Sequence, residues 1–99
     1  MAEGEVPGGR VHAFISGRVQ GVGFRFFVQR AASEAGVTGW VRNRWDGQVE
    51  AVAEGEPGSL ARFTAALRKG SPGSFVSDVD LEWGDEQGEF EAFEIRATV

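Results

Sequence analysis

The chain has no cysteine and one histidine, His12, among its 99 residues. The missing thiol excludes disulfides, thiolate zinc sites, iron–sulfur clusters and cysteine nucleophiles. A single histidine also excludes a histidine-built metal site and a pair of histidines acting as acid and base. No metal or cofactor held by cysteine or by several histidines is therefore expected, and the lack of cysteine suits a reducing compartment such as the cytoplasm.

Long apolar runs are also missing, so no segment is expected to cross a bilayer and no membrane partner is expected. Residues 1–9 are polar and rich in glycine, do not have the form of a signal peptide, and are expected to be disordered. Residues 10–99 are enough for one domain, because a second core would leave each half too small to fold alone. A monomer is the default expectation, since no long apolar seam is left over.

The formal net charge of −5 argues against nucleic acid as a partner, because such partners require a basic surface. The charge is unevenly distributed along the chain. Residues 1–44 hold six arginines against three glutamates, whereas residues 45–99 hold four basic residues against twelve acidic ones. A site for a small anion is therefore expected in the first half of the chain.

Apolar periodicity predicts seven elements. Alternation indicates strands, a spacing of three and four residues indicates helices, and an Asp–Gly pair at 46–47 between two β-favouring runs indicates a hairpin. The predicted elements are a strand at 10–16, a helix at 24–35, strands at 40–43 and 48–54, a helix at 57–69, a strand at 75–83 and a last edge strand at 93–99.

This order is β α β β α β with a short terminal strand. It predicts an α+β, ferredoxin-like split βαβ sandwich, in which two helices cover one face of an antiparallel sheet. The other face of the sheet is then open to solvent.

The first dense group of the fifteen glycines, Gly17, Gly21 and Gly23, falls between the first strand and the first helix. A loop of bare backbone amides backed by the positive end of a helix can hold an anion of phosphate size. Arg25, in the first turn of that helix, can donate two parallel hydrogen bonds to phosphate oxygens. From residue types alone, a plain tight turn with a solvated arginine is an equal alternative, since the segment completes no nucleotide-binding fingerprint.

Two sequence blocks closely resemble the signature pair of the acylphosphatase family: SGRVQGVGFR at 16–25 and GWVRNRWDGQVE at 39–50. Both blocks occur in the family's order and separation, and the likeness continues through LRKGSPGSFVSDVDLEW and FEAFEIR. The resemblance covers about residues 11–96, and the family's fold is the ferredoxin-like arrangement already predicted.

The resemblance implies metal-independent hydrolysis of an acyl phosphate, a carboxyl–phosphate anhydride, to a carboxylate and inorganic phosphate. It implies that Arg25 binds the phosphate and that Asn43 holds the attacking water. It also implies a phosphate loop whose main-chain amides come from Gln20, Gly21, Val22, Gly23 and Phe24. The predicted fold makes the first and second strands neighbours, so Asn43 is expected to lie beside this loop, with Arg42 and Arg44 on the opposite face.

Other features have functional interpretations that we regard as weaker. Asp78 and Asp80 lie on one strand face at a separation compatible with a carboxylate pair, but a solvated outer face explains them. His12 is a candidate general base, but with no visible partner it is expected to be a surface histidine.

Two alternatives to an acylphosphatase remain open at this stage. The rings of Trp40, Trp45, Trp83 and Phe14 are candidates for an RNA-stacking platform on the open sheet face, although packing in the core or on the sheet is the expected use. A ferredoxin-like module that binds an anion without turnover is the other alternative.

Overall fold

The computed structural model describes residues 6–99, and its elements follow the predicted order. The helix at 24–35 and the helix at 57–69 have the predicted bounds. The elements are β1 (Arg10–Arg18), α1 (Phe24–Ala35), β2 (Thr38–Asn43), β3 (Val49–Glu54), α2 (Pro57–Lys69), β4 (Phe75–Gly84) and β5 (Phe93–Ile95).

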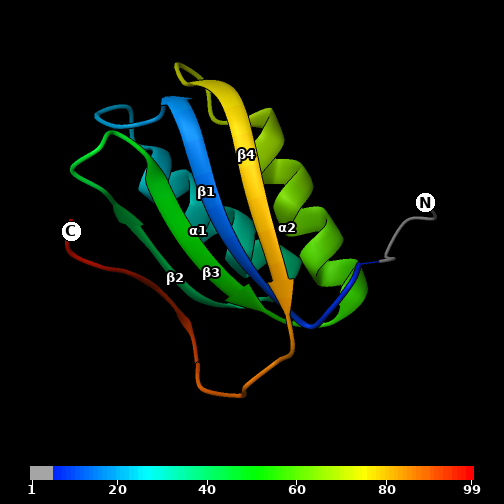
Figure 1. The fold of residues 1–99 in the computed structure, drawn as a ribbon. Coiled ribbons are helices and arrows are strands. Elements are labelled where there is room, and N and C mark those ends of the chain that lie inside the picture. The colour runs from blue at the N-terminus through cyan, green and yellow to red at the C-terminus, as the bar shows by residue number, and fades with distance from the viewer. Residues whose placement is uncertain (1–5) are drawn as a thin grey trace.

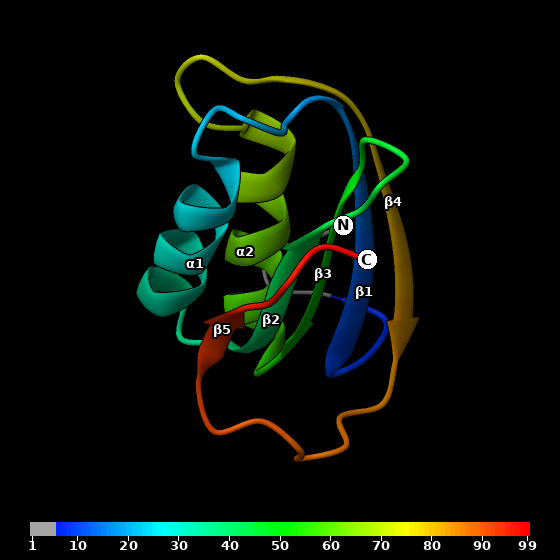
Figure 2. The same ribbon diagram turned by 90° about the vertical axis from the view of Figure 1, so that its left-hand side faces the viewer.

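The strands form one sheet in the order β4-β1-β3-β2-β5. Figure 1 shows the sheet with α1 and α2 behind it, and Figure 2 shows both helices on the same side of the sheet. This arrangement confirms the α+β, ferredoxin-like fold, with one sheet face covered and the other left open.

The last strand departs from the all-antiparallel prediction, because β5 pairs with β2 in parallel. β4 ends beside the start of β1, at the edge of the sheet opposite β2. The connection that follows β4 crosses the end of the sheet at which β4 finishes, and it reaches β2 at Gly39, where β2 begins. β5 therefore runs along β2 in the same direction as β2. β5 is also shorter than predicted, although backbone hydrogen bonds continue to Val99, whose N–H donates to the Asn43 carbonyl over 3.2 Å.

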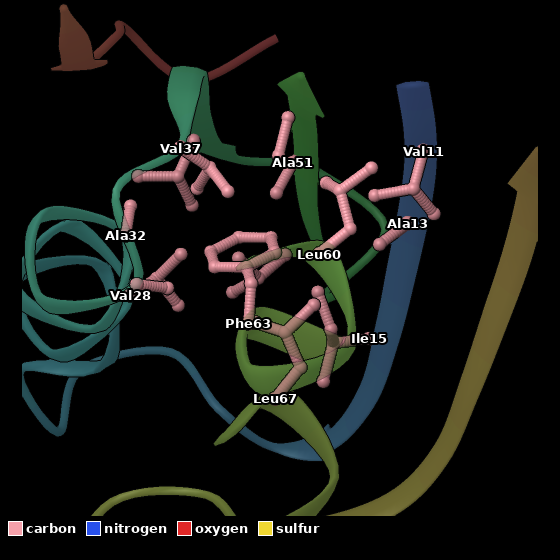
Figure 3. Packing of buried hydrophobic residues seen from close by; sticks show 14 of the residues in the cluster. Val11, Ala13, Ile15, Val28, Ala32, Val37, Ala51, Leu60, Phe63 and Leu67 are labelled. Atoms are coloured by element: carbon pink, nitrogen blue, oxygen red, sulfur yellow. The ribbon is translucent and has the colours of Figure 1, made fainter. Parts of the chain in front are cut away.

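The core lies between the sheet and the two helices, as Figure 3 shows. Phe63 lies at its centre and is completely buried. Alternate residues of β1 and the predicted apolar stripes of both helices surround this ring, because each element has one apolar face to bury. The labelled neighbours are Val11, Ala13, Ile15, Val28, Ala32, Val37, Ala51, Leu60 and Leu67.

The apolar pattern of residues 75–83 predicts that Phe75, Val79, Leu81 and Trp83 share one face of β4, but Phe75 lies outside the core. Phe75 is 66% exposed, whereas Val76 packs against the core. The pairing of β1 with β4 shifts by one residue between Ser16 and Gly17, so the alternation of faces changes at this point. A prediction based on a strict period of two is wrong beyond such a shift.

The predicted lead, residues 1–9, is only partly described. Residues 1–5 lie outside the described residues. Val6 packs against the core, and the Gly9 carbonyl accepts a hydrogen bond from the Gly55 N–H over 3.2 Å. Within residues 6–99 no helix is both long and apolar enough to span a membrane.

Candidate active site

The glycine-rich segment after β1 and the hairpin between β2 and β3 lie at the same end of the sheet (Figures 1 and 2). The sequence-based expectation that the first two strands are neighbours is wrong, because β3 lies between them. The fold instead brings the loop across the end of β3 to reach the hairpin that follows Asn43.

Gln20 joins the loop to the hairpin through its side chain. Its Nε2 donates to the Arg44 carbonyl over 2.7 Å and to the Gln48 carbonyl over 2.9 Å. Both hydrogens of one amide group are thereby used to fix the loop against the residues that flank the turn. The family resemblance implied only a main-chain role for Gln20, and nothing in residue type or spacing indicates this contact.

Gly23 precedes α1 in the left-handed conformation, with φ 72°. Other residues adopt this conformation at a cost of about 1–2 kcal/mol. No side chain of residues 6–99 caps the helix, and its first turn contains no acidic residue. The first amides of α1 therefore remain available to an anion, at the end of the helix where the macrodipole is positive.

A small cavity of about 120 Å³ lies between the loop and β2. It contains five of the seven predicted site residues. Gln20 is instead directed to the hairpin, and Val22 packs against the core. Val19 and Phe26 also contribute to the lining, although neither was predicted from the sequence. The cavity is lined by Val19, Gly21, Gly23, Phe24, Arg25, Phe26 and Asn43.

Arg25 is the one charged residue in this lining. No carboxylate of residues 6–99 forms an ion pair with it. An unpaired guanidinium next to free helix amides is suited to a dianionic phosphoryl group, which can accept from both. Asn43 adds a side chain that can donate and accept hydrogen bonds at the same cavity.

Arg42 and Arg44 lie on the open sheet face, opposite Asn43, as predicted from alternation. Arg42 Nε donates to Glu50 Oε1 over 2.9 Å, and Arg44 Nη1 donates to the same oxygen over 3.4 Å. His12 lies on this face too, with its Nε2 2.6 Å from Glu50 Oε2. The histidine therefore has a partner that the sequence analysis did not identify, and it is not among the residues that line the small cavity.

Glu50 is only 3% exposed and ties three strands together. Burial raises the pKa of its carboxyl group, but the hydrogen bonds and charges of Arg42 and His12 outweigh burial and place this pKa below its ordinary value. The group is therefore ionised at neutral pH and acts as a structural anion beneath the cationic side chains.

The two candidate carboxylates on β4, Asp78 and Asp80, are exposed on the open face at the edge of the sheet. They face Ser16 and Phe14 across the pairing with β1. This placement fits the interpretation as a solvated outer face.

The three tryptophans do not form one platform. Trp83 packs against the core, on the covered face, while Trp40 lies on the open face. The guanidinium groups of Arg42 and Arg96 lie 4.5 Å and 5.1 Å from the Trp40 ring centroid, and the ring is only 8% exposed. Trp45 is 85% exposed in the hairpin turn, so the expectation that it packs in the core or on the sheet is wrong.

Comparison with known proteins identifies the family of this chain. The acylphosphatase family model matches residues 11–95. The chain belongs to the acylphosphatase family. It is 52% identical to an acylphosphatase of Syntrophobacter fumaroxidans over 87% of this chain and 89% of that protein. It is 54% identical to an acylphosphatase of Bacillus licheniformis over 82% of this chain and 90% of that protein.

The fold agrees with solved structures of acylphosphatases. The crystal structure of acylphosphatase from Bacillus subtilis superposes with a TM-score of 0.85 at 41% identity, covering 88% of this chain and 97% of that one. Residues 11–95, which the family model matches, therefore make up nearly all of the described fold.

Proposed function

We propose that this acylphosphatase hydrolyses acyl phosphates without a metal ion or cofactor, through the small cavity between the loop and β2. The observation that carries the proposal is the meeting of three kinds of group at one cavity: free helix amides, the unpaired Arg25 guanidinium and the Asn43 side chain. Gln20, Gly21, Val22, Gly23 and Phe24 form the phosphate loop in this proposal.

In the proposed reaction, Asn43 orients a water molecule for in-line attack on phosphorus. A bond forms between the water oxygen and phosphorus, the bond from phosphorus to the acyl oxygen breaks, and the carboxylate leaves with the electron pair. The proton of the water passes to a phosphate oxygen. Arg25 and the loop amides stabilise charge on the equatorial oxygens, which is the main contribution a protein makes to phosphoryl transfer.

No strong acid is needed in this scheme, because a carboxylate is a good leaving group. The scheme is therefore compatible with a cavity in which Arg25 is the only ionisable side chain. It also leaves Glu50 and His12 to their structural roles on the open face.

The test is phosphate release from benzoyl phosphate and acetyl phosphate by the purified protein in excess EDTA. We expect rapid release that EDTA does not change. Binding of phosphate without turnover would instead favour the anion-binding module, and loss of activity in EDTA would refute metal independence.

We further propose that the protein works as a cytoplasmic monomer with a small-molecule substrate and no nucleic-acid partner. The lack of cysteine and the acidic net charge support this interpretation, and the two guanidinium groups over Trp40 disfavour RNA stacking on that ring. Size-exclusion chromatography with light scattering tests the monomer. A filter assay with single-stranded RNA tests the absence of nucleic-acid binding, and retention of RNA would contradict it.

A further inference from the structure

The small cavity is too small to enclose both a phosphoryl group and an aromatic acyl group. Sites that enclose a small molecule measure roughly 300–1,000 Å³, whereas this cavity measures about 120 Å³. If the phosphoryl group occupies it, as proposed above, the acyl group must lie on a neighbouring surface. The inference below rests on that proposed function and asks which surface this is.

In-line geometry limits the direction of the acyl group. The attacking water and the leaving oxygen lie on opposite sides of phosphorus. Asn43 holds the water in the proposed function, so the acyl oxygen points away from Asn43 and from the hairpin that follows it. The exposed ring of Trp45 belongs to that hairpin and is on the side of the water.

Phe26 provides the surface on the α1 side of the cavity. It lines the small cavity and also a groove of about 770 Å³ that runs between α1 and β5. Phe26 is 66% exposed, whereas Phe24 two residues earlier is buried and Phe27 is half-buried. An exposed aromatic ring shared by two hollows is a ready contact for an apolar group.

One turn of helix beyond Phe26, the groove presents Arg30. The rise between residues four apart is about 6 Å, roughly the length of one aromatic ring with its substituent. Arg30 is exposed and has no ion-pair partner within residues 6–99. Gln29 is already engaged, because its Nε2 donates to the Phe93 carbonyl over 3.1 Å and holds β5 against α1.

The one acidic residue of the groove, Glu91, lies further away from the phosphate loop. It precedes Ala92, whose carbonyl accepts a hydrogen bond from the Gly39 N–H at the start of β2. The start of β2 follows the C-terminal end of α1, whereas Phe26 and Arg30 lie in the first and second turns of α1. An acyl group of one ring length would therefore meet Arg30 before Glu91.

We propose that this groove is the acyl-binding subsite. Phe26 packs against the apolar body of the acyl group, and Arg30 binds a carboxylate at its far end. The preferred substrates are then monophosphorylated dicarboxylic acids whose free carboxylate lies about one ring length from the phosphoryl group.

The test compares 4-carboxybenzoyl phosphate with benzoyl phosphate, and benzoyl phosphate with acetyl phosphate. Arg30→Glu is expected to lower the ratio of kcat/KM for 4-carboxybenzoyl phosphate over benzoyl phosphate about tenfold, and Arg30→Gln about threefold, as for an exposed ion pair. Phe26→Ala is expected to lower the ratio for benzoyl over acetyl phosphate about fivefold, because acetyl phosphate is too short to contact the ring.

Arg62→Glu is the matched control for charge. Arg62 is an exposed arginine of α2 whose Nη2 contacts Ser59 Oγ, and it does not line this groove. We expect it to leave both ratios within twofold of wild type. Thermal unfolding verifies that each variant is folded at the assay temperature.

The outcomes separate this inference from the proposed function. Absence of phosphate release from every substrate by the wild-type protein would refute the proposed function itself. Release with unchanged ratios in the Arg30 and Phe26 variants, or equal changes in Arg62→Glu, would refute the subsite alone.

Discussion

At the scale of single residues, the proposed function assigns phosphate binding to Arg25 and positioning of the water to Asn43. Arg25→Ala is expected to weaken competitive inhibition by inorganic phosphate about tenfold or more, because a charge-assisted contact is lost. Asn43→Ala is expected to leave that inhibition nearly unchanged and to lower kcat about a hundredfold, since the water loses its orientation. Steady-state kinetics with phosphate as inhibitor measures both effects, and the reverse pattern would mean that the two roles are exchanged.

Gln20 is expected to act on catalysis through the loop rather than by touching the substrate. Gln20→Glu keeps the shape of the side chain but turns a double donor into an acceptor that faces the carbonyls of Arg44 and Gln48. We expect kcat to fall about tenfold, because the loop and the hairpin that follows Asn43 are no longer fixed to each other.

The control for Gln20→Glu is Gln48→Glu in the same hairpin. Gln48 Nε2 donates to Ser16 Oγ over 2.9 Å, and a glutamate there can accept from the same hydroxyl. We expect this control to retain most of the activity. The rates are measured well below the unfolding temperature, so full kcat in a destabilised Gln20→Glu would show that Gln20 supports only the fold.

The residue scale is also where the sequence was least informative about contacts. Residue types and spacing predicted a site at Arg25 and the loop glycines, and the family resemblance added Asn43. Of these residues, Arg25, Asn43, Gly21 and Gly23 meet at one cavity. Neither line of reasoning predicted the Gln20 hydrogen bonds or the partner of His12, because those contacts depend on the register of strands far apart in the chain. Glu50 lies opposite Phe14 of β1 and opposite Arg42 of β2, because β3 lies between these two strands. This strand order cannot be read from the local sequence.

At the scale of elements, periodicity was reliable where an element buries one face throughout. Both helices satisfy that condition, and their predicted bounds are confirmed. Periodicity was unreliable where the core-facing and solvent-facing positions of a strand exchange, as at the shift in pairing that leaves Phe75 exposed. Pairing direction was unpredictable for β5, since local sequence does not record which edge of the sheet the chain reaches.

Gly39 in β2 offers a test of how closely β2 and β3 pack. Its φ is 146°, and a Cβ atom there would lie 1.9 Å from the Val52 carbonyl oxygen. Because backbone cannot yield as a flexible side chain does, Gly39→Ala is expected to lower the free energy of unfolding by about 3 kcal/mol or more. Urea denaturation measures the change.

Gly84→Ala makes the same substitution in β4, where a Cβ would meet nothing within 4 Å. We expect it to change the free energy of unfolding by less than about 1 kcal/mol. Similar losses in both variants would indicate that the Gly39 effect is one of strand propensity and not of the close approach to β3.

At the scale of the whole molecule, one buried carboxylate connects segments that are distant in the sequence. Glu54, at the end of β3, is 3% exposed. It forms an ion pair with Arg10 at the start of β1, and it accepts hydrogen bonds from the N–H groups of Gln87 and Gly88, each over 3.0 Å. Glu54 therefore helps to hold the connection between β4 and β5 to the sheet, together with the ion pair that Glu89 of this connection forms with Arg10.

The Glu54 anion is expected to make stability depend on pH. Burial raises the pKa of Glu54, but the amides of Gln87 and Gly88 and the charge of Arg10 outweigh burial and place this pKa below its ordinary value. A carboxyl group whose folded-state pKa is lowered stabilises the fold above its unfolded-state pKa, and this stabilisation disappears as the pH falls through the folded-state pKa. The free energy of unfolding is therefore expected to be constant near neutral pH and to fall below about pH 4.3.

Glu54→Gln tests the origin of that dependence. We expect it to lower the free energy of unfolding at pH 7 by about 1.5 kcal/mol, because Arg10 and the amides of Gln87 and Gly88 lose a charged partner while Arg10 keeps Glu89, and to reduce the loss between neutral and acidic pH. Glu82→Gln on exposed β4 removes the same charge and is expected to change neither quantity by more than about 0.5 kcal/mol. Urea denaturation at several pH values measures both quantities. If stability fell equally steeply in acid in Glu54→Gln, the pH dependence would originate at another group, and Glu50 would be the next residue to substitute.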